Sequence, residues 1–343
     1  MKVLNPFIAV LVLIAAGGLL GMSQGTQFLV GVVLPSVAFL VFIVGFIRKV
    51  LDWSSSPVPF KIPTTCGQGR SLSFIKEDRF DCPTTKGDVI VRMFLEVFLF
   101  RSLFRNTRAE VHDGPKIVYG SSIWLWLLGI TFHYAFLTIV VRHLRLFMEP
   151  VPFFVPIIEY LDGFLQIGAP VLFMSGILLV AAAGALMARR LIMPQIRYIS
   201  LPADYFPLLL IMAIGITGIL MRHTFRVDIT HVKELTLGLA SFSWNNPGGI
   251  HPIFFIHVAL VSTLMVYFPF SKLMHMGGIF FSPTRNMAND SRAKRHINPW
   301  NDPNIKPHAY ASYEDEFREF MVDAGIPVEK ELPAKPATEE EAE

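Results

Sequence analysis

The stretch SSIWLWLLGITFHYAFLTIVVRHLRLF, Ser121 to Phe147, is long and apolar enough to cross a lipid bilayer, yet it contains His133 and His143. An ionisable side chain inside a membrane span is costly, and its presence commonly marks a functional site. A second apolar stretch near the other end of the chain, HPIFFIHVALVSTLMVYFPFSKLMH, contains His257 and His275. These two histidine-bearing spans decide how the rest of the chain is interpreted.

The composition is that of a membrane protein. Of the 343 residues, 52% are hydrophobic and only 17% are charged, whereas soluble domains have about 25% charged residues. Windows of about twenty apolar residues, separated by charged loops, predict an all-α fold: a polytopic bundle of about six transmembrane helices with a cytoplasmic loop and tail. The net charge of +3 is too small to indicate nucleic-acid binding, and two cysteines are too few for a disulfide framework.

Six apolar segments account for this expectation. The expected spans are residues 6–20, 27–47, 121–147, 164–187, 205–221 and 250–274. The first is short and could be the apolar region of a signal peptide, but it has a single basic residue, Lys2, and no small-residue cleavage site at its end. We therefore expect the first two segments to form a retained helical hairpin. Pro269 predicts a kink in the last span.

The charges of the loops indicate which way the spans run. Residues 48–119 are rich in Lys and Arg, whereas the loop 148–163 contains neither. The positive-inside rule then places the basic loop and both termini in the cytoplasm of a multi-pass protein of the cell (inner) membrane. Within the basic loop, residues 89–108 predict an amphipathic helix that lies in the headgroup plane or packs on a partner subunit.

The chain divides into four expected regions. These are an N-terminal transmembrane hairpin (1–50), a cytoplasmic loop with the amphipathic helix (51–120), a four-helix region carrying the histidines (121–278) and a cytoplasmic tail (279–343). In the tail, residues 312–324 predict one short helix with Ser312 as its N-cap. Residues 329–343 are rich in Pro, Glu and Ala, which is typical of a disordered acidic end.

The histidine spacing suggests two bis-histidine haem sites. Haem iron with two axial imidazoles needs one histidine on each side of its plane, usually from different helices. The third and sixth spans run antiparallel, which pairs His133 with His275 towards the cytoplasm and His143 with His257 towards the outside. His257 and His275 are expected on one face of a single helix. Their helical rise of about 27 Å exceeds the rise of about 15 Å in the third span, so tilt and the kink at Pro269 must absorb the difference.

Small and basic residues near the histidines are compatible with haem. Gly129 and Ala135 leave room beside His133 for a macrocycle, although both are also ordinary helix-packing residues. Arg142 and Arg145 could bind haem propionates, or they could simply extend their charged groups to the membrane surface.

The alternative for the four histidines is interhelical hydrogen bonding, or a proton path in a transporter or channel. Such a protein is expected to have acidic residues inside its spans or two broken helices in related positions. Glu149, Glu159 and Asp162 lie in the outer loop instead, and the sequence has no internal repeat. The sequence also contains no H-E-x-x-H motif of the kind found in metalloproteases.

The spacings H-x9-H (His133, His143) and H-x17-H (His257, His275) resemble those of the nitrate reductase gamma subunit family of di-haem cytochromes b, over residues 27–276. The whole chain is more similar still to the DsrM family, the cytochrome b subunits of the Dsr membrane complex of sulfite-reducing and sulfur-oxidising microbes. That family shares the added N-terminal span and the large cytoplasmic loop. The resemblance implies that these histidines are the axial ligands of two haem b groups.

The same resemblance implies a role in electron transfer and a set of partners. Electrons would be exchanged with menaquinone and with a cytoplasmic iron–sulfur subunit similar to heterodisulfide reductase. Further partners would be a periplasmic multihaem cytochrome c, a periplasmic iron–sulfur protein and a second membrane subunit. The chain has no evident centre for substrate chemistry, so we expect one subunit of a quinone-linked oxidoreductase complex rather than a complete enzyme.

In that family the quinone site lies near the outer haem. Here this implies the surroundings of His143, with Arg142, Tyr160 and Asp162 as candidate residues.

The two cysteines, Cys66 and Cys82, lie in the loop expected in the cytoplasm, where thiols stay reduced. Their spacing fits no zinc or iron–sulfur pattern, so we interpret them as structural thiols.

Overall fold

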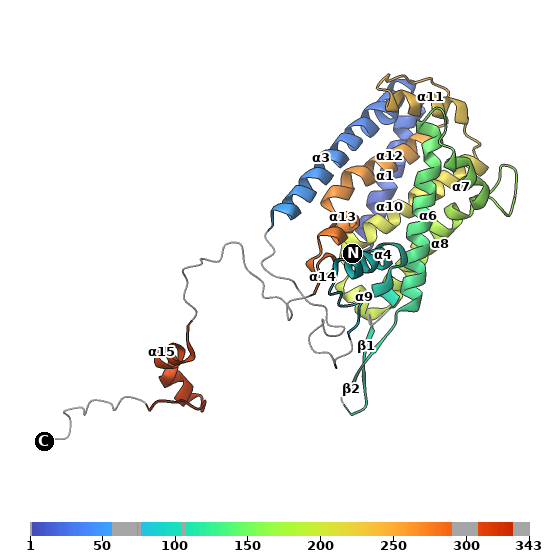
Figure 1. Ribbon diagram of the computed structural model, residues 1–343. Helices are drawn as coiled ribbons and strands as arrows, with labels where there is room; N and C mark the ends of the chain where they lie inside the picture. Colours follow the sequence, from blue (N-terminus) through green and yellow to red (C-terminus); the bar gives the residue numbers. More distant parts are fainter. Residues whose placement is uncertain are drawn as a thin grey trace. The chain divides into compact units, whose positions relative to one another are not determined.

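The computed structural model describes residues 2–56, 74, 77–104, 108–114, 116–289 and 308–331. It contains two compact units, Met1–Ala293 and Lys294–Glu343 (Figure 1). Cys66 and most of the acidic end predicted over residues 329–343 lie outside the described residues.

The larger unit consists mainly of helices. In chain order its helices and strands are α1 (Leu4–Met22), α2 (Gln24–Phe28), α3 (Leu34–Ser55), α4 (Lys86–Leu99), α5 (Arg101–Phe104), β1 (Arg108–His112), β2 (Lys116–Gly120), α6 (Ile123–Phe147), α7 (Phe154–Asp162), α8 (Met174–Ile192), α9 (Pro194–Ile199), α10 (Pro202–His223), α11 (Ile229–Ala240), α12 (Pro252–Tyr267), α13 (His275–Gly278) and α14 (Pro283–Asn286). A π-helical turn over Leu29–Val33 joins α2 to α3, so these helices form one continuous span.

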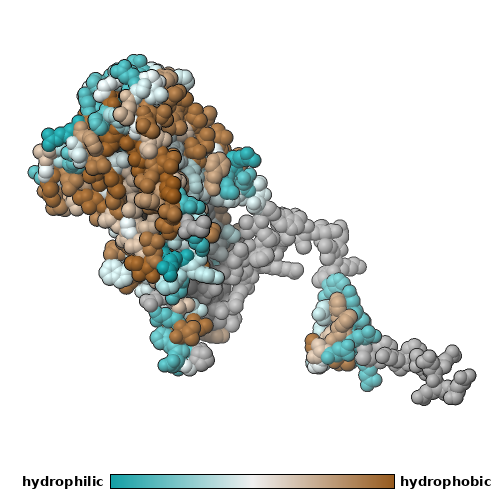
Figure 2. All heavy atoms as spheres, turned by 180° about the vertical axis from the view of Figure 1, so that it is seen from behind, coloured by the Kyte–Doolittle hydropathy of each residue, from teal (hydrophilic) through white to brown (hydrophobic). Residues whose placement is uncertain are grey.

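Six helical segments among the described residues are long and apolar enough to cross a membrane. They are Leu4–Met22, Gln24–Ser55, Ile123–Phe147, Met174–Ile192, Pro202–His223 and Pro252–Phe270. The predicted fold class and number of spans are therefore confirmed. Hydrophobic side chains cover much of the flank of the bundle (Figure 2). Many of them, including Leu11, Leu40 and Val140, are exposed, as expected of a surface that faces lipid.

The bundle has two ends that carry different elements. One end, called the α4 end below, gathers α4, α9, α13 and α14, and the other, the α11 end, gathers α7 and α11 (Figure 1). Helix α6 runs from the α4 end to the α11 end, and α12 runs back towards the α4 end. The two helices are therefore antiparallel, as the sequence predicted.

The centre of the bundle is an apolar cluster shared by five helices. Its buried residues include Val10 of α1, Ala135 of α6, Leu179 of α8, Leu210 of α10 and Leu260 of α12. Helix α1 packs along α12, and α6 packs along α8. In the described structure, α6 and α12 are not a closely packed pair, so they face each other through side chains. The space between α6 and α12 is therefore available to the side chains that the two helices direct into it.

The N-terminal hairpin lies very close to α12 and the turn after it. A Cβ added at Gly21 would lie 2.8 Å from the Cβ of Phe255, and one added at Gly45 would lie 2.7 Å from the Cβ of Pro269. Carbon atoms do not approach this closely, so both positions require glycine. The hairpin is thus fitted to the last span rather than loosely appended to the bundle.

The fourth span differs from its prediction. It begins at Met174 rather than Phe164, because residues 164–173 form turns between α7 and α8. Gly168 has a φ of +80° and is followed closely by Pro170, and both residues interrupt a helix. Hydropathy alone did not distinguish this apolar turn region from the span.

The last span is interrupted between its two histidines. Helix α12 ends at Tyr267, and the chain continues in 3₁₀ turns over Phe268–Phe270 and Lys272–Met274 before α13 begins at His275. The prediction that His257 and His275 lie on one face of a single helix is therefore wrong. Pro269, expected only as a kink, lies in the first of these turns and has no amide hydrogen to continue the helix. Because residues 257–275 are not one continuous helix, the rise of about 27 Å expected between His257 and His275 does not apply. Its disagreement with the rise between His133 and His143 therefore disappears.

The predicted amphipathic helix over 89–108 is shorter in the structure. It is α4, capped at its start by Thr85, whose hydroxyl oxygen accepts a hydrogen bond from the Asp88 amide at 3.2 Å. It ends at Phe100, which has a φ of +50°, an uncommon value for a residue other than glycine.

The two faces of α4 are arranged unusually. Arg92 and Glu96 are buried, whereas Ile90, Phe94 and Phe98 are exposed. The polar face thus packs on the protein, including α14, and the apolar face points outward. This orientation is compatible with a helix at the membrane surface, which was one of the two predicted environments.

Several short elements of the larger unit were not predicted, among them α7, α9, α11, α14 and the antiparallel hairpin of β1 and β2, in which Val111 is opposite Ile117. Because they are short, their sequence patterns are weak.

The smaller unit contains the predicted tail helix as α15 (Tyr310–Asp323). The helix begins before Ser312, whose hydroxyl donates to the Ala309 carbonyl, so the prediction of Ser312 as N-cap is wrong. Glu314 is buried and accepts hydrogen bonds from the amides of Glu329 and Lys330. These bonds fold the following chain back onto α15.

Candidate functional site

His133 and His275 face each other at the α4 end of the bundle. Their ring centroids are 5.9 Å apart, and the ring planes are at 85°. Nδ1 of His133 lies 2.7 Å from the Gly129 carbonyl oxygen, and Nδ1 of His275 lies 2.8 Å from the Lys272 carbonyl oxygen. A carbonyl can only accept, so these bonds place the proton on Nδ1 and leave a lone pair on each Nε2.

The separation of the two rings suits a metal ion between them. A bond from a metal to an imidazole nitrogen is about 2 Å long, and the nitrogen lies about 1 Å from the ring centroid. Two imidazoles on opposite sides of one ion would therefore have centroids roughly 6 Å apart. The distance between His133 and His275 is close to this value.

His143 and His257 form the second pair, towards the α11 end. They are near enough for the charge of one ring to affect the other. Nδ1 of His143 lies 2.7 Å from the Ile139 carbonyl oxygen. Nδ1 of His257 lies 2.9 Å from Oγ1 of Thr217 on α10, and the Thr217 hydroxyl in turn donates to the Ala213 carbonyl at 2.9 Å. The threonine oxygen is thereby left to accept from the histidine.

Thr217 is a residue that the sequence analysis missed. The hydroxyl of a buried threonine in an apolar span needs a partner, and that need was the available signal. The following residue, Gly218, lies against the same ring: an added Cβ would be 3.5 Å from Cε1 of His257. Helix α10 therefore both orients and accommodates His257.

All four histidines share one arrangement. Each uses Nδ1 for a hydrogen bond, and no described residue forms a hydrogen bond with any of the four Nε2 atoms. The side chains of His143 and His275 are exposed, and no Nε2 of the four is a buried atom without a partner, so each of these nitrogens is open to an added ligand. Within the described ranges, no group of three or more His, Cys, Asp or Glu could enclose a metal ion. A metal bound here must bring equatorial ligands of its own, as haem iron does, so the residues fit that group.

Aromatic side chains pack around the pair at the α4 end. The ring of Phe100 lies 5.0 Å from that of His133, and the ring of Phe132 lies 5.2 Å away, both nearly perpendicular to it. Phe100 is the residue with the left-handed backbone at the end of α4. The end of α4 thus covers His133 from outside the bundle.

The two arginines predicted as propionate contacts already have carboxylate partners. Nε of Arg142 lies 2.9 Å from Oδ2 of Asp162, and Nη1 of Arg145 lies 2.9 and 2.8 Å from the two carboxylate oxygens of Glu159. Arg142 also stacks on Phe173, with 3.8 Å between its guanidinium carbon and the ring centroid. These contacts give both side chains a structural explanation without a propionate.

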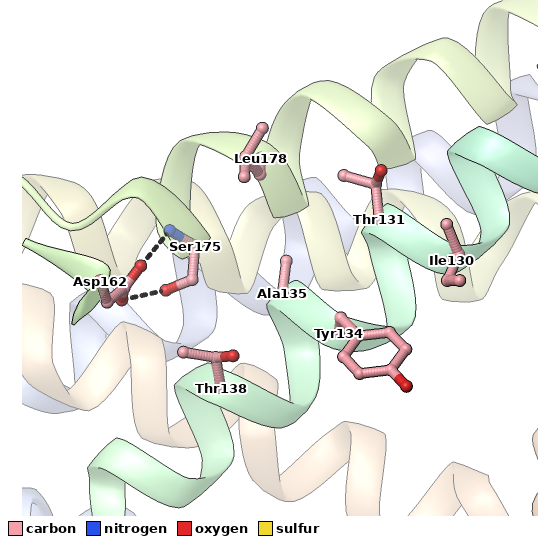
Figure 3. A pocket seen from close by; sticks show the side chains of 8 residues that line it. All are labelled: Ile130, Thr131, Tyr134, Ala135, Thr138, Asp162, Ser175 and Leu178. Atoms are coloured by element: carbon pink, nitrogen blue, oxygen red, sulfur yellow. Dashed lines mark hydrogen bonds between the residues drawn. The ribbon is translucent and has the colours of Figure 1, made fainter. Parts of the chain in front are cut away.

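A pocket of about 420 Å³ lies between α6 and α8 in the half of the bundle next to α7 (Figure 3). Its wall is apolar apart from a few hydroxyls and one carboxyl group, and it is lined by Ile130, Thr131, Tyr134, Ala135, Thr138, Asp162, Ser175 and Leu178. Asp162 accepts two hydrogen bonds from Ser175, 2.7 Å from the amide and 2.6 Å from the hydroxyl. A second hollow of about 380 Å³ shares Thr138 and Asp162 with the first.

The candidate quinone residues are placed differently from one another. Asp162 is buried beside Arg142 and lines the pocket, whereas Tyr160 on α7 is exposed and lines neither hollow.

Cys82 is buried, and Nδ2 of Asn289 donates to its sulfur. This packed environment agrees with the interpretation of Cys82 as a structural thiol.

Comparison with known proteins gives consistent results. Residues 95–291 match the nitrate reductase gamma subunit family. The chain is 45% identical over 282 residues to the Hdr-like menaquinol oxidoreductase cytochrome b-like subunit of Archaeoglobus fulgidus, an alignment that covers 80% of this chain and 84% of the relative. It is also 45% identical over 278 residues to the protein of the same name from Archaeoglobus profundus, covering 79% and 82% of the two chains.

Proposed function

The chain belongs to the nitrate reductase gamma subunit family, and from this premise we propose that it is a di-haem b membrane subunit that passes electrons between menaquinol and a partner protein. His133 and His275 would hold one haem b, and His143 and His257 the other. The observation that carries this proposal is the pair of imidazoles with ring centroids 5.9 Å apart, whose Nε2 atoms form no hydrogen bond with a described residue.

The residues around the histidines supply orientation. Bound haem would supply one-electron transfer at its iron. The Nδ1 hydrogen bonds to Gly129, Ile139, Lys272 and Thr217 fix the tautomer and leave each Nε2 as the nitrogen that would bind haem iron. The apolar cluster between the two pairs, including Leu210 and Leu260, excludes water from the centre of the bundle.

The pocket between α6 and α8 is the best-supported place for the quinol headgroup. Its apolar walls suit a naphthoquinol ring, and its size lies within the range of small-molecule sites. Asp162 is the base that would take a proton as the quinol is oxidised, while Ser175 and Arg142 hold its carboxylate in place. Of the residues expected at the quinone site, Asp162 lines this pocket and Arg142 is its ion-pair partner.

The wider setting is also part of the proposal. Loop charges support a cell-membrane protein with both termini and the α4 end in the cytoplasm. There a cytoplasmic iron–sulfur subunit would exchange electrons with the haem held by His133 and His275. By resemblance to the DsrM family, the complex would serve sulfite or sulfur metabolism. It would include a periplasmic multihaem cytochrome c, a periplasmic iron–sulfur protein and a second membrane subunit.

A transporter with a histidine proton path is less well supported. Such a path needs hydrogen bonds that link titratable groups. Among the described residues, none of the four histidines bonds to a carboxylate, and each Nδ1 ends at a carbonyl or a threonine hydroxyl.

Haem stoichiometry combined with a redox titration of the purified subunit tests the proposal. We expect two b-type haems per chain with separate midpoint potentials and low-spin bands in the reduced-minus-oxidised spectrum. A folded protein without these bands would refute the assignment.

A further inference from the structure

At the α4 end, the buried Arg92 and the half-buried Arg285 form no ion pair with any carboxylate of the described residues. Arg92 on α4 is 5% exposed, and its Nη1 donates to the Thr284 carbonyl of α14 at 2.8 Å. The next residue, Arg285, is half-buried. The Nε atoms of Arg92 and Arg285 are both buried, and neither has a hydrogen-bond partner among the described residues. A buried guanidinium with an unpaired donor is costly, and a second cation beside it adds to the cost.

The nearby carboxylates are committed elsewhere. Glu96 accepts hydrogen bonds from the amide and the hydroxyl of Ser102, and Asp81 is paired with Arg101. Burial lowers the pKa of Arg92, and the charge of Arg285 lowers it as well, while Glu96 and Asp81 act in the opposite direction. The two arginines therefore form a site that would be stabilised by an additional anion.

The segment that carries Arg92 covers His133, and the segment that carries Arg285 follows His275. Arg92 lies on α4, two turns before Phe100, whose ring packs on His133. Arg285 lies on α14, which follows directly from the segment that begins at His275. Helices α4 and α14 pack on each other. The cationic pair thus lies on the same two segments, α4 and the chain after His275, that border this histidine pair.

We propose that Arg92 and Arg285 bind a propionate of the haem held by His133 and His275. This inference rests on the proposed function, because it requires a haem at that position. It reverses the expectation from the sequence, which looked for propionate contacts at Arg142 and Arg145. Those arginines form ion pairs with Asp162 and Glu159, whereas neither Arg92 nor Arg285 forms an ion pair with a described residue. A guanidinium binds a carboxylate through charge-assisted hydrogen bonds.

Spectroelectrochemical titration of the purified full chain tests the assignment. A positive charge beside haem iron favours the reduced state, so Arg92→Gln and Arg285→Gln should each lower the midpoint potential of one haem. The affected haem should be the one that is lost when His275 is replaced, and the other potential should stay unchanged. Arg92→Lys keeps the charge and should keep the midpoint potential close to that of the wild type. Arg79→Gln is the matched control, because Arg79 is at the same end but is 63% exposed and pairs with Asp88.

The outcomes separate the two proposals. If the wild-type chain binds no haem, the proposed function fails. If both glutamine variants keep two haems at wild-type potentials, the propionate assignment fails while the haem assignment stands. The same anion site could be occupied by a lipid phosphate. Loss of a co-purifying phospholipid from the glutamine variants, with both potentials unchanged, would also overturn the assignment. Should Arg92→Gln fail to fold, Arg285→Gln at the less buried position provides the same measurement.

Discussion

Nδ1 of His257 is hydrogen-bonded to the hydroxyl of Thr217, whereas the other three histidines of the two pairs use a carbonyl of their own segment. This one ring is therefore oriented by a neighbouring helix, α10, and its position depends on how α10 packs on α12. The pair of His143 and His257 therefore depends on a residue of α10, whereas the pair of His133 and His275 does not.

Replacing either histidine of a pair should remove the same haem. His143→Ala and His257→Ala should each leave one haem per chain with the same remaining potential, and His133→Ala and His275→Ala should leave the other. Haem content by the pyridine haemochrome method and a redox titration would measure this. His251→Asn is the control: His251 lies in the same region and caps α12 by accepting from the Ile253 amide, a task asparagine can perform. Loss of both haems from each single variant would contradict the pairing.

Removing the Thr217 hydroxyl should weaken one site only. In Thr217→Val the Nδ1–H of His257 loses its acceptor, which makes the imidazole a poorer electron donor and should raise the potential of that haem. Loss of such a supporting bond typically reduces metal affinity by about 10- to 100-fold. Haem retention during detergent washing and the potential of each haem are the measurements. Thr263→Val is the control, since the Thr263 hydroxyl bonds only to the Ala259 carbonyl of its own helix. Equal effects of the two substitutions would refute this role of Thr217.

Asp162→Asn should slow quinol oxidation while both haems remain. The amide can still accept a hydrogen bond from Ser175, but it cannot take a proton, and loss of a general base costs about a hundredfold or more in rate. Stopped-flow reduction of the haems by a menaquinol analogue would measure the rate. Glu159→Gln is the matched control, because Glu159 pairs with Arg145 and lines neither hollow. A normal rate in Asp162→Asn would place the quinol elsewhere.

Asp162→Asn should also destabilise the folded chain, because the buried guanidinium of Arg142 loses its counter-charge. Breaking a buried ion pair of this kind costs about 3–5 kcal/mol. Thermal unfolding of the haem-loaded protein therefore has to be measured alongside the rate. A slow variant with wild-type stability would mean that the effect is chemical alone.

Gly21→Ala should loosen the N-terminal hairpin from the bundle. The new methyl group would lie 2.8 Å from the Cβ of Phe255, and overpacking of this kind costs about 1–3 kcal/mol. Gly18→Ala is the control, because its methyl group would meet only the Ile256 side chain, at 3.4 Å. The midpoint of thermal unfolding should fall for Gly21→Ala and stay nearly constant for Gly18→Ala. An unchanged midpoint for Gly21→Ala would mean that the hairpin can shift without cost.

The spans and the histidines could be predicted because each rests on a strong local signal: a long apolar window or a rare ionisable residue inside it. The errors came from places where tertiary contacts decide. Residues 164–173 are apolar, but they form turns after Gly163. Pro269 lies in a 3₁₀ turn directly after α12, where only a kink was expected. The short elements α7 and α11 carry too few residues for a clear periodic pattern.

The supporting residues were harder to find than the histidines. Thr217 becomes informative only when α10 is placed beside α12. Arg92 belongs to the segment 89–108 that the sequence predicts as an amphipathic helix, and only the structure, in which α4 packs on α14, shows that it is buried. A sequence pattern gives the spacing of such residues along one helix, but not which neighbour covers them.

The turn over Phe268–Met274 means that the two imidazoles of the last span are not mounted on one rigid rod. His257 lies within α12, whereas His275 begins α13, which is followed by α14 packed on α4. On the proposed function, a protein that docks at the α4 end should change the potential of the haem held by His133 and His275 more than that of the other haem.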